Sequence, residues 1–280
     1  NGLAAFEVPK RTSSSSPIYT TIYTASLWLA GKDSSGTIKS NIRTYYDANQ
    51  PIAGPIMNSS LYSTDGPLWD WVWKIDCFEI QTFVAWYQAG VNDSLNGTST
   101  QANNFPGYTI PTSILTWPGN GDITKGQAFN LAPFFDRNGN NLYEPSAGDY
   151  PLIKGDEAIF FIFNDERPFY AGTSTLSPMK TEVHGMAYAY SSLSDSAIKN
   201  TIFVDYTIYN RSNLTYDSTY IGIWADLDIG NPTDDYIGCD VARNTFYGYN
   251  GDANDENMAG INGYGIYPPA QAVTILQGAK

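Results

Sequence analysis

The chain has 280 residues, which is long enough to bury a large core in one sizeable β domain or in two smaller ones. Aromatic residues reach 15% and charged residues only 15%, a balance that excludes a disordered chain and favours a packed β protein. The formal net charge of −13 disfavours nucleic acid and anionic membrane surfaces as partners, because their phosphates would be repelled. No run of about eighteen apolar residues is present, so we expect no membrane insertion.

Residues 1–16 predict a flexible N-terminal segment, because the stretch ends in a run of Thr and Ser. Residues 18–30 and 37–46 then predict two strands that form a β-hairpin. The chain begins with Asn1 and not with Met, which suits a mature secreted product or a fragment. We expect one β domain over residues 17–280, either complete or the N-terminal part of a longer protein.

Farther along the chain, residues 69–73 predict a strand, because alternate Trp side chains would share one face. The spacing of apolar residues over 77–88 predicts one short helix, with Gly90 as a plausible stop. Residues 92–126 predict a long polar loop. Further strands are predicted over residues 158–163, 181–190, 200–209, 216–225, 245–249 and 272–277. The fold class that follows is all-β: a loop-rich antiparallel β-sandwich with one short helix, stabilised by calcium loops.

The segment from Asp136 to Asp165 contains the first candidate metal site. Oxygen-bearing side chains alternate at its start, a Gly lies between two of them, and two more carboxylates follow; the candidate ligands are Asp136, Asn138, Asn140, Glu144 and Asp149. Such side chains can converge on Ca²⁺, which takes six to eight oxygen ligands at roughly 2.3–2.6 Å. The alternative is a set of Asx-turns without metal.

A second acidic cluster consists of Asp226, Asp228, Asn231, Asp234, Asp235 and Asp240. The first two leave the end of a predicted strand on one face, and a Gly-Asn-Pro turn at 230–232 could fold Asp234 or Asp235 back toward them. So many carboxylates repel one another unless a cation compensates, and the alternative is a solvated acidic loop. Residues 250–256 are a third candidate, for which a solvated loop is the preferred interpretation. We expect one or two structural Ca²⁺ ions.

Other chemistry finds little support in the sequence. His184 is the only histidine, which suits packing better than catalysis, and no GxSxG or GxxxxGK[ST] motif is present. Cys77 and Cys239 either form a disulfide or remain two buried thiols. A glycoside hydrolase with two carboxylates, or a carbohydrate-binding module, stays open as an alternative, with aromatic platforms that could come from Trp69, Trp71, Trp73, Trp86 and Trp117.

Several stretches taken together resemble a family of large secreted or surface proteins of the Bacteroidetes, typically exported by the type IX secretion system. They are Ala25 to Gly31 (ASLWLAG), Trp117 to Gly121 (WPGNG), the segment from Asp136 to Asp165, Glu182 to Tyr188 (EVHGMAY), and Asp217 to Asp228 (DSTYIGIWADLD) continuing to Asp240. The likeness extends from about Phe6 to Gln277.

The resemblance implies a location outside the cell or on its surface, with further β domains and a sorting domain after Lys280. It implies no catalytic residues. O-glycans of the Bacteroidetes are attached at Asp-Ser or Asp-Thr followed by a small or aliphatic residue, and the matching acceptors are Ser94, Ser196 and Ser218.

The function expected from all of this is that of an extracellular, calcium-stabilised structural or adhesive protein without catalysis. Its low charge density and many Asn, Ser, Thr and Tyr side chains suit polar and aromatic interfaces. We expect self-association, for example as a subunit of a filament or layer, or contacts with other surface proteins or glycans.

Overall fold

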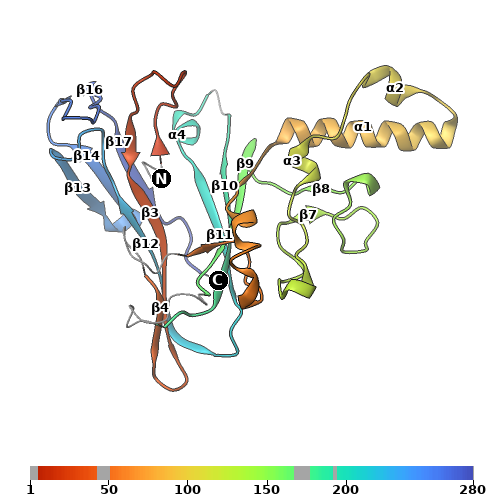
Figure 1. Cartoon of the computed structure of the whole chain (residues 1–280). Coiled ribbons are helices and arrows are strands. Elements are labelled where there is room, and N and C mark those ends of the chain that lie inside the picture. Colours follow the sequence, from red (N-terminus) through yellow and green to blue (C-terminus); the bar gives the residue numbers. More distant parts are fainter. Residues whose placement is uncertain (1–5, 43–50, 167–176, 192–193, 280) are drawn as a thin grey trace. The chain divides into compact units, whose positions relative to one another are not determined.

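The computed structural model describes residues 6–42, 51–166, 177–191 and 194–279. Strands account for 36% of these residues and helices for 19%, and the strands form six antiparallel sheets (Figure 1). The predicted loop-rich, all-β character is confirmed. Backbone contacts divide the chain into two compact units: unit 1 combines residues 1–49 with 215–280, and unit 2 consists of residues 50–214.

Unit 2 is built on β9 (Glu157–Asn164), the central strand of a five-stranded sheet. β10 (Thr181–Ala189) pairs with one edge of β9, and β11 (Phe203–Asn210) pairs with β10. Two short strands share the other edge of β9, namely β5 (Ile52–Ala53) and β6 (Trp73–Asp76). The three long strands lie near their predicted positions because β9 is a continuous apolar run and the other two are rich in β-branched and aromatic residues.

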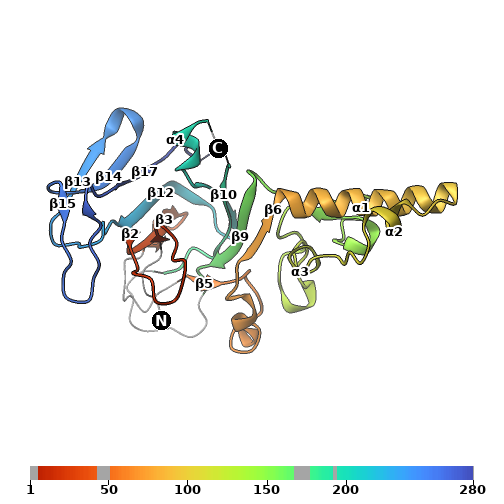
Figure 2. The same ribbon diagram turned by 90° about the horizontal axis from the view of Figure 1, so that it is seen from above.

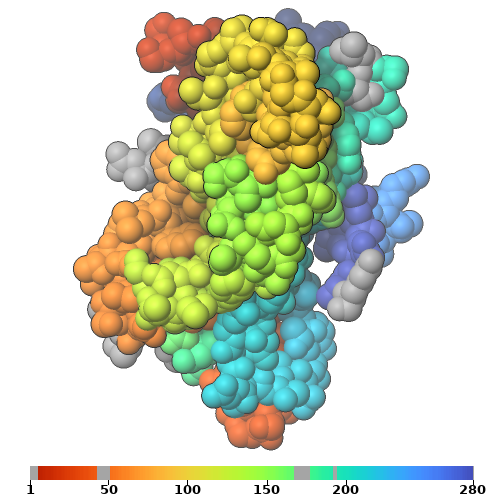
Figure 3. Space-filling model, turned by 90° about the vertical axis from the view of Figure 1, so that its right-hand side faces the viewer, coloured from red at the N-terminus to blue at the C-terminus, as the bar shows by residue number. Residues whose placement is uncertain are grey.

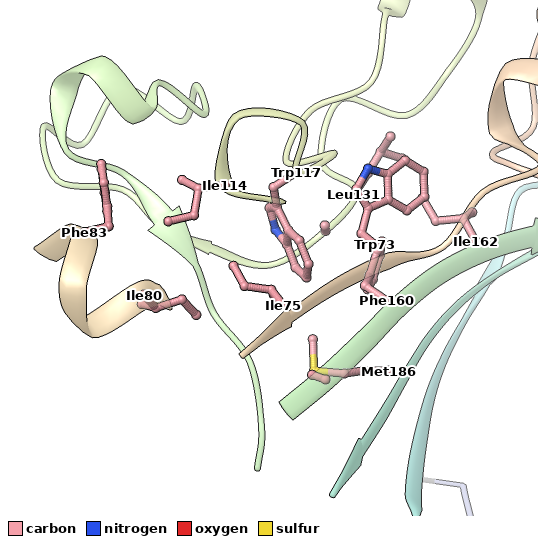
Figure 4. Packing of buried hydrophobic residues seen from close by; sticks show 12 residues of the cluster. Trp73, Ile75, Ile80, Phe83, Ile114, Trp117, Leu131, Phe160, Ile162 and Met186 are labelled. Atoms are coloured by element: carbon pink, nitrogen blue, oxygen red, sulfur yellow. The ribbon is translucent and has the colours of Figure 1, made fainter. Parts of the chain in front are cut away.

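One face of this sheet carries the hydrophobic core of unit 2. Phe160 and Ile162 alternate on this face of β9 and are 2% and 3% exposed. Trp117 covers them from the loop side, with its ring centroid 5.4 Å from that of Phe160, and Figure 4 shows its indole beside Ile75. The helices and loops of residues 77–156 form the outer surface of this layer (Figure 3).

The predicted helix over 77–88 is longer than expected, because α1 spans Cys77–Asn96. Asp76 caps its N-terminus by accepting a hydrogen bond from the backbone N–H of Glu79, and Figure 2 shows β6 leading directly into the helix. The helix ends at Gly97, which adopts the left-handed conformation that terminates many helices.

Gly90, the predicted stop, lies inside α1. A Cβ atom at this position would come within 2.5 Å of the side chain of Gln101, which donates a hydrogen bond to the carbonyl oxygen of Trp86. Gly90 therefore lets α2 (Thr100–Asn104) approach α1 closely and does not end the helix.

The predicted strand over 69–73 does not form. Residues Gly66–Trp69 form a 3-10 helix with Pro in its first turn, and β6 begins only at Trp73. The Trp side chains consequently do not share a face, since Trp73 is buried and Trp71 is 66% exposed. The predicted polar loop over 92–126 is also more regular than expected. It contains the end of α1, together with α2, α3 (Thr112–Leu115) and a 3-10 helix at Ile123–Lys125.

A buried ionic group joins the strands at the end of the core. The Glu182 carboxylate is fully buried; its Oε1 accepts hydrogen bonds from Arg211 at 2.7 Å and pairs with Nε2 of His184 at 2.9 Å. Its Oε2 accepts a hydrogen bond from the backbone N–H of Ile56 at 2.7 Å. Burial opposes ionisation of Glu182, but these hydrogen bonds outweigh it and lower the pKa of the carboxyl group. His184 therefore has a structural partner, in line with the packing role predicted for it.

Unit 1 contains a three-stranded sheet in which β3 (Thr24–Asp33) lies between β12 (Tyr216–Asp226) and β4 (Ile38–Asn41). The predicted hairpin is present as β3 and β4, although residues 43–46 of the predicted second strand lie outside the described residues. The first predicted strand, 18–30, is split into β2 (Thr20–Ile22) and β3.

Part of the segment predicted to be flexible is paired. β1 (Phe6–Glu7) forms a two-stranded sheet with β2, and the backbone N–H of Val8 donates to the carbonyl oxygen of Tyr19. The hydroxyl group of Tyr264 donates to the carbonyl oxygen of Val8, so this segment is attached within unit 1. The hydrogen bond from Tyr264 could not be predicted from local patterns, because Tyr264 and Val8 lie far apart in the sequence.

A second three-stranded sheet of unit 1 has the order β13–β14–β17. β14 and β17 lie close to two predicted strands, whereas β13 was not predicted. These and the remaining elements are β13 (Asp235–Asp240), β14 (Thr245–Asn250), β17 (Ala270–Thr274), β15 (Asn254–Asp255), β16 (Gly265–Ile266), β7 (Phe134–Phe135), β8 (Tyr150–Pro151), α4 (Ser196–Lys199) and 3-10 helices at Ser59–Leu61, Pro145–Ala147 and Val241–Arg243.

Replacement of Phe160 by Ala tests the core of unit 2. The variant should lose about 3–5 kcal/mol of unfolding free energy, because a large buried ring is removed and a cavity remains. Phe78→Ala is the matched control, since Phe78 is 73% exposed on α1 and its removal should change stability by less than about 0.5 kcal/mol. Urea unfolding of the two variants measures both values. Equal losses would contradict the assignment of Phe160 to the core.

Candidate metal site

In the loop from Asp136 to Asp149, hydrogen bonds within the loop occupy oxygen atoms of all five predicted ligands, and most of the donors are backbone N–H groups. The two carboxylate oxygens of Asp136 accept hydrogen bonds from the N–H groups of Gly139 and Asn141 at 2.8 and 2.7 Å. Oδ1 of Asn138 accepts from the N–H of Asn140 at 3.0 Å. These are Asx-type turns, the alternative that the sequence left open.

The second half of the loop closes in the same way. Asp149 is fully buried, and its two oxygens accept hydrogen bonds from the backbone N–H groups of Arg137 and Glu144, each at 2.8 Å. Oε2 of Glu144 in turn accepts from Nδ2 of Asn140. The guanidinium group of Arg137 lies 5.0 Å from the ring centroid of Tyr87 and supplies a positive charge to the loop. The loop is therefore ordered by internal hydrogen bonds, and an added cation would compete with backbone donors.

The second acidic cluster has a different environment. Asp226 ends β12 and Asp235 begins β13. The turn between them folds Asp235 back, as the sequence predicted, so that its Oδ2 accepts a hydrogen bond from the N–H of Ile229 at 2.7 Å. Asp228 lies near enough to act on the charge of Asp235.

Two residues that the sequence assigned to the separate run at 250–256 join this group. Asn250 lies directly across from Asp235 in the pairing of β13 with β14. Asp255 is 1% exposed, and its carboxylate accepts hydrogen bonds from the N–H groups of Asn231 and Tyr264 at 3.2 and 2.7 Å. Residues of the second and third candidates of the sequence thus lie close enough for their charges to interact. We call Asp228, Asp234, Asp235, Asn250 and Asp255 the Asp235 cluster.

Three oxygen atoms of the Asp235 cluster are buried without a hydrogen-bond partner. They are Oδ1 of Asp234, Oδ1 of Asp235 and Oδ1 of Asn250. The whole Asn250 residue is only 7% exposed, while its Nδ2 donates to two backbone carbonyl groups and so fixes the orientation of the amide. A buried acceptor without a donor costs about 1–3 kcal/mol. A water molecule could supply a hydrogen bond here, but it would not neutralise the carboxylate charge.

The pKa values of the neighbouring carboxyl groups reflect the same lack of compensating partners. The pKa of Asp235 is raised to about 6, mainly by burial and also by the neighbouring charges of Asp234, Asp255 and Asp228, against the lowering effect of the Ile229 N–H. Burial, together with the charge of Asp226, raises the pKa of Asp228 to about 6. Burial also raises the pKa of Asp226 and Asp255. The carboxylates therefore need a positive charge to be fully ionised at neutral pH.

The chemistry of this oxygen set fits a hard cation such as Ca²⁺. In residues 6–42, 51–166, 177–191 and 194–279, no three Asp, Glu, His or Cys side chains are already placed to hold one ion together. Binding at the Asp235 cluster would therefore use the Asn250 amide oxygen and require some carboxylate side chains to rotate. The unpartnered oxygens of Asp234 and Asp235 are the ones free to do so.

The remaining predicted site residues are the two cysteines and the three glycosylation acceptors. Cys77 and Cys239 carry free thiols, half-buried and exposed respectively. The three predicted glycosylation acceptors are all exposed: Ser94 on α1, Ser196 at the start of α4, and Ser218 in the bulge of β12 with a φ of +51°. These positions are accessible to an enzyme, and their glycosylation stays a prediction.

The five Trp residues proposed as sugar platforms do not form an exposed row. Trp73 and Trp117 are buried in the core of unit 2, Trp69 packs against Trp73, and Trp86 is half-buried. Of these five, only Trp71 is largely exposed. The sequence alone could not distinguish buried from exposed Trp residues, because Trp occurs both in hydrophobic cores and on binding surfaces.

Comparison with protein-family models, with curated proteins and with solved structures finds no match to this chain. The likeness to secreted proteins of the Bacteroidetes therefore stays a prediction from the motifs. Among the described helices, none has both the length and the apolar character that crossing a bilayer would require.

The raised pKa values predict how the ion-free protein responds to pH. Between about pH 4 and pH 6 the folded chain keeps protons on Asp228 and Asp235 that the unfolded chain has lost, so stability falls as the pH rises through this window. In the Asp228→Asn/Asp235→Asn variant, the decrease in unfolding free energy between pH 4 and pH 6 should be smaller by on the order of 1 to 2 kcal/mol. Unfolding in metal-free buffers from pH 4 to pH 7.5 measures it. An unchanged pH dependence in the variant would contradict this electrostatic account of the cluster.

Proposed function

We propose that this chain is part of an extracellular structural or adhesive protein that one or two bound Ca²⁺ ions stabilise. The observation that carries the proposal is the set of buried, unpartnered oxygens on Asp234, Asp235 and Asn250. A Ca²⁺ ion would supply the missing partner to all three and would neutralise the surrounding carboxylates. The loop from Asp136 to Asp149 is the second candidate position, because its oxygen side chains already surround one turn.

The location and partners rest on composition and motifs. A net charge of −13 with only 15 Lys and Arg residues suits a setting where millimolar divalent cations screen the acidic side chains, such as the cell exterior. The proposed partners are other copies of the chain, other surface proteins or glycans. The exposed Asp-Ser motifs at Ser94, Ser196 and Ser218 support attachment of O-glycans in a bacterium of the Bacteroidetes.

A catalytic role is the second candidate for this chain. A glycoside hydrolase needs two carboxylates separated by about 5–10 Å in an open cleft that holds the sugar. The acidic residues of the Asp235 cluster are instead half-buried or buried beneath a turn, and most of the tryptophans proposed as platforms contribute to the core. These observations favour cation binding for the carboxylates over hydrolysis.

Thermal unfolding with excess Ca²⁺ and after EDTA treatment tests the proposal. An ion that binds only the folded state should add about 2.7 kcal/mol at a Ca²⁺ concentration one hundred times the dissociation constant. The Asp235→Asn and Asp234→Asn variants should lose most of this gain. Asp217→Asn, which removes an exposed carboxylate of β12, should keep it. Asp136→Asn then reports whether the first loop holds a second ion.

The same samples, examined by size-exclusion chromatography with light scattering, test the structural role. Self-association should grow with protein concentration in Ca²⁺ and weaken in EDTA. Unfolding curves that coincide in Ca²⁺ and EDTA would overturn the cation proposal, and a strict monomer at high concentration in Ca²⁺ would overturn self-association.

A further inference from the structure

One face of the β13–β14–β17 sheet carries three tyrosines. Tyr236 lies directly across from Tyr249, and Tyr247 lies two residues before Tyr249, so alternation places all three on the same face. The opposite face packs inward, since a Cβ atom at Gly248 would come within 3.0 Å of Leu227. We call Tyr236, Tyr247 and Tyr249 the tyrosine platform. Figure 2 shows the strands that carry it side by side.

Two glycines allow the rings to lie down on the sheet. A Cβ atom at Gly238 would come within 2.4 Å of the Tyr247 ring, and one at Gly251 within 2.5 Å of the Tyr236 ring. Each ring therefore covers a glycine where any other side chain would push it outward.

The rings are in mutual contact and open to solvent. The ring centroids of Tyr236 and Tyr249 lie 6.1 Å apart with 28° between the planes, and those of Tyr247 and Tyr249 lie 5.9 Å apart. Tyr236 is 60% exposed and Tyr249 is 41% exposed. Tyr247 is half-buried beside them. The two exposed rings, extended by Tyr247, form an apolar patch of the kind that marks binding surfaces.

The residues around the rings keep the surface flat and polar at its rim. Ala270 and Ala272 of β17 lie directly across from Tyr249 and Tyr247, and their small side chains do not rise above the rings. At the far end, the hydroxyl groups of Thr245 and Thr274 share a hydrogen bond of 2.8 Å. Asp240 on the same face forms an ion pair with Arg243.

We propose that the tyrosine platform binds a neutral polysaccharide, whose sugar rings stack their C–H faces on the tyrosine rings. Stacking on flat aromatic surfaces needs no deep pocket, whereas protein partners usually bury anchor side chains in pockets. The net charge of −13 disfavours an anionic polymer. Tyrosine hydroxyl groups and the threonine rim supply hydrogen bonds to sugar hydroxyl groups.

The proposal stands without the Ca²⁺ proposal, although the two sites share a hairpin. Asp235 and Asn250 form the cross-strand pair next to Tyr236 and Tyr249, and the carbonyl oxygen of Asp234 accepts a hydrogen bond from the N–H of Gly251. A cation at the Asp235 cluster would hold the end of the hairpin, whereas the rings themselves make the contact with sugar.

Affinity electrophoresis of the full chain in gels that contain xylan, hydroxyethyl cellulose, glucomannan or laminarin tests the platform, together with depletion on insoluble cellulose and chitin. At least one neutral polymer should retard the protein. Tyr236→Ala and Tyr249→Ala should each weaken binding at least tenfold. Tyr220→Ala is the matched control, since Tyr220 is 73% exposed on β12 in the same unit and should leave binding unchanged.

Two further variants separate stacking from a structural effect. Tyr236→Phe and Tyr249→Phe keep the rings and should retain binding within about threefold. Gly238→Ala should lift the Tyr247 ring and weaken binding while far-UV circular dichroism stays unchanged. The proposal is overturned if no neutral polymer binds, or if alginate, an anionic polymer, binds more tightly than every neutral polymer. It is also overturned if the Ala variants lose self-association but bind glycans as well as the unmodified protein does. None of these outcomes changes the Ca²⁺ result, so the two proposals fail independently.

Discussion

Repulsion between neighbouring buried carboxylates is the constraint on which the organisation of unit 1 depends. The turn after β12, the start of β13, the end of β14 and the short β15 all bring an acidic or amide side chain to the Asp235 cluster. Hydrogen bonds from Ile229, Asn231 and Tyr264 hold two of these carboxylates in place, yet they neutralise no charge. A cation would convert this repulsion into a cross-link between segments that are distant in sequence, and it would fix the hairpin that carries the tyrosine platform.

The two acidic loops show how similar sequences can meet different electrostatic conditions. In the loop from Asp136 to Asp149, backbone N–H groups satisfy the carboxylates and Arg137 adds a positive charge. In the Asp235 cluster the nearest charges acting on Asp235 are negative, and oxygen atoms remain without partners. The same residue types therefore stabilise a turn in the first loop, whereas in the Asp235 cluster their charges remain uncompensated.

Local patterns in the sequence predicted β9, β10 and β11 well, because each strand's apolar, β-branched and aromatic residues lie within one short chain segment. The features that the sequence did not predict depend on contacts between segments that are separate in the chain. The prediction that Gly90 ends the helix is wrong. Gly90 is needed for the close approach of Gln101 from a later helix, which local sequence patterns do not reveal. Asp255 was assigned to a separate loop, although β14 returns the chain to Asp235. β13 was missed because Gly238 weakens its strand signal, and that same glycine lets Tyr247 lie flat on the platform. The fold class could be predicted from the sequence, whereas the composition of the site depended on topology.

The most direct test of the central claim is a crystal structure of the protein grown with Ca²⁺, with anomalous scattering used to locate the ion. The account predicts one peak at the Asp235 cluster, within roughly 2.3–2.6 Å of oxygens from Asp234, Asp235 and Asn250. A well-ordered cluster that holds only water, with its carboxylates unpaired at neutral pH and saturating Ca²⁺, would contradict it.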